Sequence, residues 1–408
     1  MRSFYKLRNS VRHYAWGSPS SIPEFLGLPN DSGDPWAELW MGAHPNDPSI
    51  ALSEEGSVAL DALIAENPVR ALGEATASRF DSLPFLFKLL AAGRPLSIQA
   101  HPDKAQAARG FQRENEAGLP ADAFDRNYKD SNHKPEILCA LTQFDAMCGF
   151  RPPERIAALL DTFACPVLHA ARGALETARE SDALRTFQKE LFSLSAADRR
   201  ALSVFADRRA AELLARGGDD ASCWNLIRAF VAEYPGDPAV VSPLYLNVLR
   251  LAPGQAIFLP AGILHAYVRG FGVELMANSD NVLRGGLTSK HVDLDELNAT
   301  LRFEPFLPRL MGPLGDGEGL DTFPSDCEEF SLSVMEGNGQ DIGLRTGVPS
   351  VIIVAEGTIT LASASGETLA LERGESAFIS AATPSPRASG RGRAFVASVG
   401  AAHSGVAS

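Results

Sequence analysis

The sequence predicts a mainly β protein, α+β overall, in which a helical domain is inserted and two barrels of related sequence follow one another. Three observations support this prediction. Short apolar runs separated by Gly- and Pro-rich turns dominate both parts of the chain, residues 152–236 show helical periodicity, and a strand pattern at 251–261 returns at 371–381. With 408 residues the chain is long enough for about two to three domains. We expect a metal-binding first barrel at 1–151 and 237–305, the helical domain at 152–236, a metal-free second barrel at 306–400 and a frayed tail at 401–408.

The charge balance and the cysteines limit the class of partner and the compartment. A net charge of −13 argues against a nucleic-acid partner, because phosphate contacts require an excess of Lys and Arg, although a local basic pocket could still bind a small anion. The five cysteines are scattered and form no Cys-x-x-Cys pair, which indicates a reducing compartment. The first residues lack an apolar signal region, and no apolar run reaches the ~18 residues of a membrane helix. We therefore expect a cytoplasmic monomer whose partner is a small molecule, with no nucleic-acid and no membrane partner.

The N-terminal part is expected to form short strands with few helices. Its first 60 residues are rich in Pro, Gly and aromatic residues, which is typical of strands and turns, and His44 is interpreted as a structural turn residue. Short helices are predicted at 60–72, where an internal proline interrupts the pattern, and at 103–118. The apolar run at 83–90 predicts a buried strand between them.

The middle of the chain predicts the inserted helical domain. Ile156, Leu159 and Phe163 lie on one face of a helix, and similar spacing recurs to the end of the segment. These apolar stripes are interpreted as core rather than as a binding surface. Strand patterns resume at 244–248, and a short helix is expected at 293–301 before the chain becomes β-like again.

Polar side chains at the edges of three strand-like runs predict a metal site. Ser97, Gln99 and His101 alternate with apolar residues, so they share one face if the segment is a strand. A polar face in an apolar sheet costs free energy unless its groups are paired or bind a ligand. With Glu136 and His265, this face offers an amide oxygen, a carboxylate and two imidazole nitrogens. Such mixed donors suit zinc, with iron or manganese as alternatives.

Each of these residues also has a structural interpretation. Gln99 and His101 could be a hydrogen-bonded pair rather than two ligands. Glu136 could form a salt bridge with Lys134, and His265 could be a core histidine. The metal hypothesis therefore depends on their joint occurrence at strand edges.

An internal repeat indicates how the two barrels differ. Leu, Gly, Phe and Ala keep their relative positions in 251–261 and 371–381, as expected where Gly makes a hairpin turn and the next strand faces a barrel interior. The residue four positions after the first copy is His265, whereas the corresponding residue after the second copy is Ser385. We therefore expect the first barrel to hold the metal and the second to be a structural copy.

Motifs in several places resemble a known family. The pattern Leu-x-x-Gly-x-x-x-Phe-x-Pro-Ala-x-x-x-His at 251–265 resembles the second motif of the cupins, which are jelly-roll β-barrels. The stretch Tyr-Lys-Asp-Ser-Asn-His-Lys-Pro-Glu at 128–136 resembles the signature of the type I mannose-6-phosphate isomerases of the cupin superfamily. Further similarity to that family occurs at 37–45, 96–104, 265–267, 274–277 and 279–290. The resemblance implies two cupin-type jelly-roll barrels.

The resemblance also implies a chemistry for the site. It implies one zinc per chain, held by Gln99, His101, Glu136 and His265, with Arg284 as the active-site arginine. The implied reaction interconverts D-mannose 6-phosphate and D-fructose 6-phosphate through an enediol or enediolate, which would link hexose phosphates to mannose and GDP-mannose supply. Arg284 could stabilise the enediolate with its planar charged fork, or it could be a rim salt bridge to an acidic neighbour such as Glu274 or Asp280.

The remaining roles are left open among several residues. Zinc-bound hydroxide, Glu274, Tyr267, Lys134 and Asp280 are candidates for the base. Tyr267 lies two residues after His265 and so on the same face of the strand. Ser97 and Lys290 are the expected phosphate contacts, because Ser97 shares the ligand face and a dianion needs a cation.

Two other function classes are compatible with the donor set. A metal-dependent cupin of a different class, such as a dioxygenase, could use iron with the same ligands, and metal analysis with oxygen uptake would identify it. A non-catalytic sugar-binding cupin is disfavoured by Arg284 together with a complete ligand set.

Overall fold

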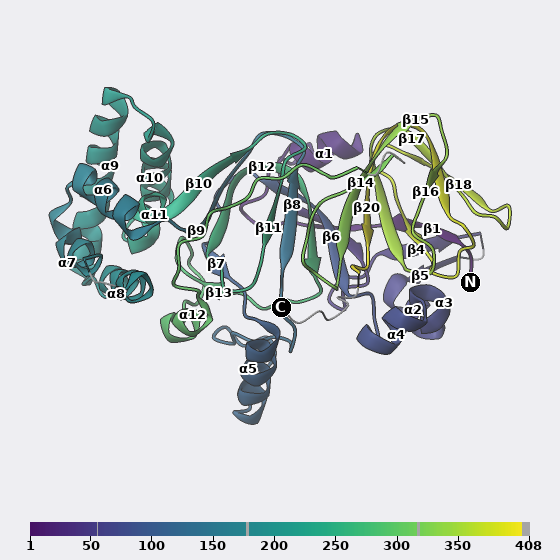
Figure 1. The fold of residues 1–408 in the computed structure, drawn as a ribbon, viewed down its shortest axis with the longest axis horizontal. Helices are drawn as coiled ribbons and strands as arrows, with labels where there is room; N and C mark the ends of the chain where they lie inside the picture. Colours follow the sequence, from purple (N-terminus) through teal and green to yellow (C-terminus); the bar gives the residue numbers. More distant parts are fainter. Residues whose placement is uncertain (55, 177–178, 316–318, 402–408) are drawn as a thin grey trace.

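The computed structural model describes residues 1–54, 56–176, 179–315 and 319–401 and shows a mixed α/β protein with two antiparallel sheets (Figure 1). Sheet I contains β2 (Ser10–Arg12), β3 (Glu38–Gly42), β6 (Phe85–Ala92), β7 (Gln99–Ala100), β8 (Glu136–Ala140), β9 (Phe144–Phe150), β10 (Leu246–Leu251), β11 (Ala256–Leu259), β12 (His265–Ala277) and β13 (Leu283–Arg284). Sheet II contains β1 (Phe4–Arg8), β4 (Ile50–Ser53), β5 (Gly56–Ala59), β14 (Leu320–Thr322), β15 (Ser331–Asn338), β16 (Ile342–Gly343), β17 (Ser350–Ala362), β18 (Thr368–Glu372), β19 (Ser376–Ile379) and β20 (Arg387–Ser398).

The composition of sheet II differs from the expected division of the chain. Residues 1–151 were assigned to the first barrel, but β1 pairs with β19, and β4 and β5 extend the same sheet. The N-terminal strand therefore contributes to the half of the molecule built mostly from residues after 319. The jelly-roll barrels were expected to be closed, but the described strand pairings form two open antiparallel sheets.

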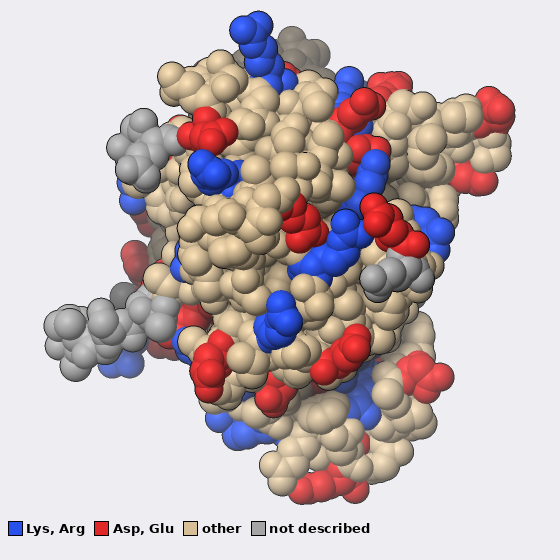
Figure 2. Space-filling model, turned by 90° about the vertical axis from the view of Figure 1, so that its right-hand side faces the viewer, with Lys and Arg blue, Asp and Glu red and all other residues tan. Residues whose placement is uncertain are grey.

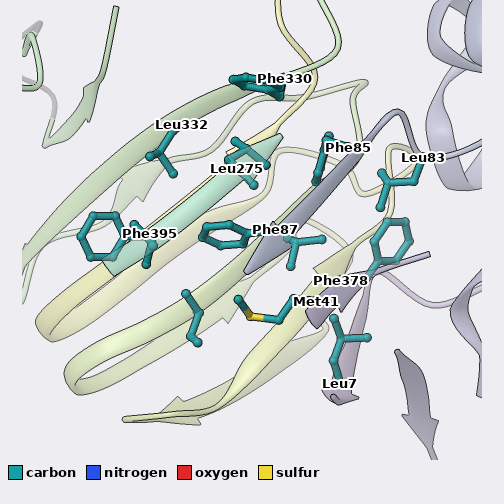
Figure 3. Packing of buried hydrophobic residues seen from close by; sticks show 14 of the residues in the cluster. Leu7, Met41, Leu83, Phe85, Phe87, Leu275, Phe330, Leu332, Phe378 and Phe395 are labelled. Atoms are coloured by element: carbon teal, nitrogen blue, oxygen red, sulfur yellow. The ribbon is translucent and has the colours of Figure 1, made fainter. Parts of the chain in front are cut away.

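Strand alternation gives sheet I one wholly apolar face and a second face where polar side chains lie among apolar ones. In β6, Phe85, Phe87 and Leu89 are buried in the core that joins the two sheets, while Lys88 between them points to the opposite side and lines a pocket. Figure 3 shows Phe87 of sheet I packed near Phe395 of sheet II, with Phe85 farther along β6 on the side of Leu83. Burial of each such side chain contributes about 1.5–3 kcal/mol, so this core is a main source of stability.

Most helices form two groups, one beside sheet II and one at the far end of sheet I, and the others lie singly (Figure 1). They are α1 (Ser21–Leu26), α2 (Leu60–Glu66), α3 (Pro68–Leu72), α4 (Glu74–Phe80), α5 (Lys104–Glu116), α6 (Pro153–Phe163), η1 (Pro166–Leu168), α7 (His169–Ala174), α8 (Glu180–Phe192), α9 (Ala196–Arg216), α10 (Ala221–Glu233), η2 (Pro238–Val241), α11 (Ser242–Tyr245) and α12 (Leu294–Thr300). The inserted segment is helical as predicted, and its apolar stripes form a buried core with residues from sheet I, such as Met147 and Phe150.

Most predicted elements are observed, with two corrections. The helix predicted at 60–72 is α2 followed by α3, divided at the proline as expected, and the helices predicted at 103–118 and 293–301 are α5 and α12. The strand predicted from residue 244 begins instead at Leu246, because Pro243 occupies the first turn of the short helix α11. The segment from Ser97 to His101 is a strand only at β7, and the rest is extended loop.

Charged side chains of both signs are mixed on one face of the molecule (Figure 2). On the face shown in Figure 2, acidic and basic side chains are interspersed, and neither sign covers it. Such a mixture is unlike the basic stripe of a nucleic-acid-binding face. In the part of the chain that the structure describes, no helix is both long enough and apolar enough to cross a bilayer.

Candidate active site and metal centre

Three strands of sheet I bring the predicted metal ligands together. β7 begins at Gln99 and is followed by His101, β8 begins at Glu136, and β12 begins at His265. The Nε2 atom of His101 lies 3.2 Å from Oε1 of Glu136, and Nε2 of His265 lies 3.5 Å from Oε2 of the same carboxylate. Residues that are far apart in the sequence therefore form one buried group.

Both histidine rings are held in the tautomer that leaves Nε2 free. Nδ1 of His101 lies 2.7 Å from the carbonyl oxygen of Asn281, and Nδ1 of His265 lies 3.0 Å from that of Ile263. Because a carbonyl oxygen only accepts, each Nδ1 donates its proton and a neutral ring carries a lone pair on Nε2. Burial lowers the pKa of His101 to about 4, against the opposing effect of Glu136, so this ring is neutral at pH 7.

Unpaired buried atoms show that this group fits a metal ion. His101 Nε2 and Glu136 Oε2 have no hydrogen-bond partner among the described residues, which costs about 1–3 kcal/mol per atom. One donor atom from each of His101, Glu136 and His265 lies within 4.8 Å of the other two. The Nε2 atom of Gln99 lies 3.3 Å from Nε2 of His265. Rotating the Gln99 side-chain amide by half a turn would exchange its nitrogen and oxygen and place Oε1 next to the histidine. Two imidazoles, a carboxylate and an amide oxygen suit zinc.

Lys134 lies against the same carboxylate. Its Nζ is 3.1 Å from Oε1 of Glu136, so the salt bridge considered as an alternative is present beside the histidines. Burial would raise the pKa of Glu136, but Lys134 and the two histidines lower it well below its usual range. Glu136 is therefore ionised, which is the form that binds a cation.

A buried lysine on the same face was not predicted. Lys88 Nζ lies 3.0 Å from Oε2 of Glu274 and 3.4 Å from Oε1 of Glu38, whose other oxygen accepts from Trp40 Nε1 at 2.7 Å. Burial disfavours the ammonium, but Glu274 and Glu38 outweigh it and raise the pKa of Lys88. A signal was available, because a single lysine inside the apolar run at 83–90 is expected only where it is paired.

Tyr267 and Glu274 face the pocket with pKa values displaced upward. Burial, with the charges of Glu274 and Glu136, raises the pKa of Tyr267 well above 10, so its hydroxyl stays protonated. That hydroxyl is buried and has no hydrogen-bond partner among the described residues. Burial also raises the pKa of Glu274, while Lys88 opposes the shift.

Three cations on the pocket wall have no acidic partner among the described residues: Arg284, Lys290 and Lys129. Burial lowers the pKa of Arg284, and the salt bridge to Glu274 or Asp280 considered for it is not formed. Burial, together with the charges of Arg284 and Lys129, lowers the pKa of Lys290, as expected when like charges face one space. Lys129 was not predicted, although it lies within the motif at 128–136.

Asp280 is held at the pocket rim by its neighbours. Its Oδ1 lies 3.5 Å from Nε2 of His44, and its Oδ2 accepts from Nδ2 of Asn46 at 2.8 Å. Burial would raise the pKa of Asp280, but the contact with His44 lowers it. His44 is buried and packs against Trp40, so it has the structural role that was predicted.

All these groups surround one pocket of about 640 Å³. Its wall includes most of the predicted site residues and the three that were missed: Ser97, Gln99, Lys134, Glu136, Tyr267, Glu274, Asp280, Arg284 and Lys290, with Glu38, Lys88 and Lys129. His101 and His265 are not among the lining residues. Both contact the lining residue Glu136, and His265 also contacts Gln99. The arrangement combines metal-binding donors with cations that have no acidic partner among the described residues, as recognition of a phosphorylated ligand requires.

Comparison with known proteins gives consistent matches over nearly the whole chain. Residues 4–153 match the family described as phosphomannose isomerase type I, catalytic domain. The mannose-6-phosphate isomerase of Salmonella typhimurium is 42% identical over 392 residues, with 95% of this chain and 97% of the relative covered. The Escherichia coli protein of that name is 41% identical over 394 residues, with 95% and 97% covered, and the Bos taurus protein is 33% identical over 399 residues, with 91% and 92% covered.

Solved structures match equally well. A crystal structure of a phosphomannose isomerase variant from Salmonella typhimurium superimposes with a TM-score of 0.91 at 39% identity, covering 98% of this chain and all 100% of that one. A zinc-bound structure of mannose 6-phosphate isomerase superimposes with a TM-score of 0.89 at 39% identity and the same coverage.

Proposed function

The chain belongs to the mannose-6-phosphate isomerase family, and from this premise we propose that it interconverts D-mannose 6-phosphate and D-fructose 6-phosphate. One observation carries the proposal: a single pocket joins a His–Glu–His group to three cations that lack an acidic partner among the described residues. A sugar phosphate has hydroxyl and carbonyl oxygens at one end and a dianion at the other, so it matches both the metal-binding donors and the cations. We further propose that the reaction links hexose phosphates to mannose and GDP-mannose supply.

We propose zinc as the metal, held by His101, Glu136 and His265 with Gln99 as the fourth ligand. The neutral His101 ring and the ionised Glu136 carboxylate support this choice, since these are the forms that bind zinc. When bound, zinc would supply a Lewis acid that polarises the oxygens on C1 and C2 of the open-chain sugar.

We propose that Lys290, Lys129 and Ser97 bind the phosphate. All three line the pocket, and their donors can satisfy the phosphate oxygens. Arg284 lies beside Lys290, and its planar fork could hold the sugar while charge develops on the enediolate. We assign Arg284 to the transition state and the other three to substrate binding.

Proton transfer requires a base that takes a proton from C2 and returns it to C1. We propose Glu274, because burial raises the pKa of its carboxyl, which strengthens the carboxylate as a base near neutral pH. Lys88 would orient Glu274 through the ion pair of 3.0 Å. Tyr267, which stays protonated, can donate to an oxygen of the enediolate, whereas Asp280 and Lys134 are held by His44 and Glu136.

We also propose that the two sheets are the cores of two cupin-type jelly-roll barrels, with the metal in the first. The repeat at 251–261 and 371–381 supports this relationship, since both copies form the same turn and strand. Under this proposal β1, β4 and β5 belong with the second barrel.

A coupled assay with mannose 6-phosphate, run with and without a chelator, tests the proposed function. We expect turnover, about one zinc per chain by elemental analysis, and loss of activity after prolonged chelation. Full activity in protein verified as metal-free would contradict the metal assignment. Oxygen uptake without isomerisation would favour the dioxygenase class instead.

A further inference from the structure

Glu329 connects the second half of the molecule to the metal centre. It lies just before β15 of sheet II, and its Oε1 is 2.8 Å from Nε2 of His133 and 3.7 Å from Nζ of Lys104. His133 stands three residues before Glu136, and Lys104 stands three residues after His101. One carboxylate therefore contacts both segments that carry these two metal ligands.

The Glu329 carboxylate is buried, and both of its oxygens accept hydrogen bonds. Glu329 is 7% exposed, and its second oxygen accepts from the Cys327 thiol at 3.2 Å. Burial would raise the pKa of Glu329, but the bond and charge of His133 and the Cys327 thiol lower it to about 2. Glu329 is thus a fixed anion at neutral pH, and its short contact with His133 is the stronger one, because the Lys104 side chain is 59% exposed and its contact is screened by water.

Lys104 is the first residue of α5, whereas the segment that carries His133 has no regular secondary structure. Residues 127–135 form a loop, which the Asn281 side chain anchors on its inner side through the carbonyl oxygens of Asp130 and Asn132. Pro135 makes the link between His133 and Glu136 stiff, so a shift of the histidine would be transmitted to the ligand. Glu329 supplies the anchor on the outer side.

No described residue after Lys290 lines the pocket, so the second half acts on the site only from outside it. We propose that Glu329 is a positioning residue through which the sheet II half holds the two ligand-bearing segments in the arrangement that binds the metal. The inference rests on the proposed function for the identity of the metal. It assigns to the second half a role in the affinity of a site to which it contributes no ligand.

The test measures zinc affinity rather than turnover. In Glu329→Gln, which keeps the size and removes the charge, we expect the zinc dissociation constant to rise about 10-fold by competition with a chromophoric chelator, as for other residues that orient ligands. Glu336→Gln is the matched control, because Glu336 forms an exposed ion pair with Arg393 in the same half and is paired with neither His133 nor Lys104. We expect it to keep the wild-type dissociation constant.

A cycle with His133 separates positioning from general stabilisation. If Glu329 acts through His133, the double variant Glu329→Gln/His133→Ala should bind zinc no more weakly than the weaker single variant. Fully additive losses, or a Glu329→Gln protein with lower melting temperature but wild-type zinc affinity, would overturn the inference. Should Glu329→Gln not fold, Glu329→Asp, which keeps the charge, should give an intermediate loss of affinity, and wild-type affinity there would overturn it too. Wild-type protein that binds zinc but does not isomerise mannose 6-phosphate would overturn the proposed function and leave this inference standing.

Discussion

The two copies of the repeated pattern, at 251–261 and 371–381, fold alike and then diverge. Gly254 and Gly374 both have φ of +85°, a conformation that favours glycine. In the first copy the backbone N–H of Ala252 donates to the Gln255 side chain at 2.9 Å, and in the second that of Glu372 donates to Glu375 at 3.0 Å. Each turn leads into a short strand, β11 or β19, so the scaffold is conserved within the molecule.

The element that follows each copy makes the difference. His265 is the first residue of β12 and is buried, with 1% of its surface exposed. Ser385 is exposed, lies outside any strand between two prolines, and has φ of +43°. The shared turn therefore determines the short strand that follows it. A metal ligand additionally requires that the next strand begin at the ligand residue itself, as β12 does, and that this residue lie against other donors.

The largest expected effect is the difference in zinc binding between substitutions at His265 and at Ser385. His265→Ala should lose metal binding and activity, because it removes one of two imidazole donors from a buried site. Ser385→Ala should keep both. Elemental analysis and the isomerase assay on the same samples test this, and comparable zinc loss in the two variants would show that the halves do not differ as described.

The next largest effect is on stability, because the lysine ion pairs compared here are buried in sheet I and partly exposed in sheet II. Lys88→Met would leave Glu38 and Glu274 buried without their cation and should lower the free energy of unfolding by about 3–5 kcal/mol. Lys6→Met removes the ion pair with Glu375 in sheet II, where both side chains are about one-third exposed, and should cost about 0–1 kcal/mol. Urea unfolding of the metal-free proteins measures both, and equal losses would contradict the comparison.

Turnover should depend on the arginine of sheet I far more than on an arginine of sheet II. Arg284→Ala should keep its zinc but lose about 10²–10³ in kcat, the usual cost of removing one preorganised donor. Arg284→Lys should recover part of the loss, since a point charge does not reproduce the planar fork. Arg393→Ala should match the wild type. A rise in KM for mannose 6-phosphate with kcat intact would instead assign Arg284 to the phosphate.

Much of the site could be predicted from local sequence, because its donors stand at the ends of strand-like runs. Gln99 and His101 alternate with apolar residues, and Glu136 and His265 each begin a strand. The same strand periodicity contained an unused signal at Lys88, whose apolar neighbours required a buried partner. The family resemblance supplied Arg284, which has no local pattern of its own.

Long-range pairing could not be predicted in this way. Nothing within β1 indicates that it joins β19, since a strand pattern specifies which face is buried and not which strand lies beside it. The role of Glu329 could not be predicted either, because its contact with His133 joins residues that are 196 positions apart in the sequence. Both features arise from how the two halves pack, which local periodicity does not encode.

The smallest expected effect is the most direct test of the comparison: Ser385→His should create no second metal site. Leu259 in the first copy pairs with the ligand Glu136, whereas its counterpart Ile379 pairs with Phe4 and Ser350, so neither strand beside Ile379 carries a carboxylate at the equivalent position. Among the described residues, no second group of three His, Cys, Asp or Glu side chains lies close enough to hold an ion. The new imidazole would also project from an exposed backbone, where a single nitrogen competes poorly with water. We therefore expect zinc content and turnover equal to wild type, and a second equivalent of tightly bound zinc by elemental analysis would show that the second half retains a latent site.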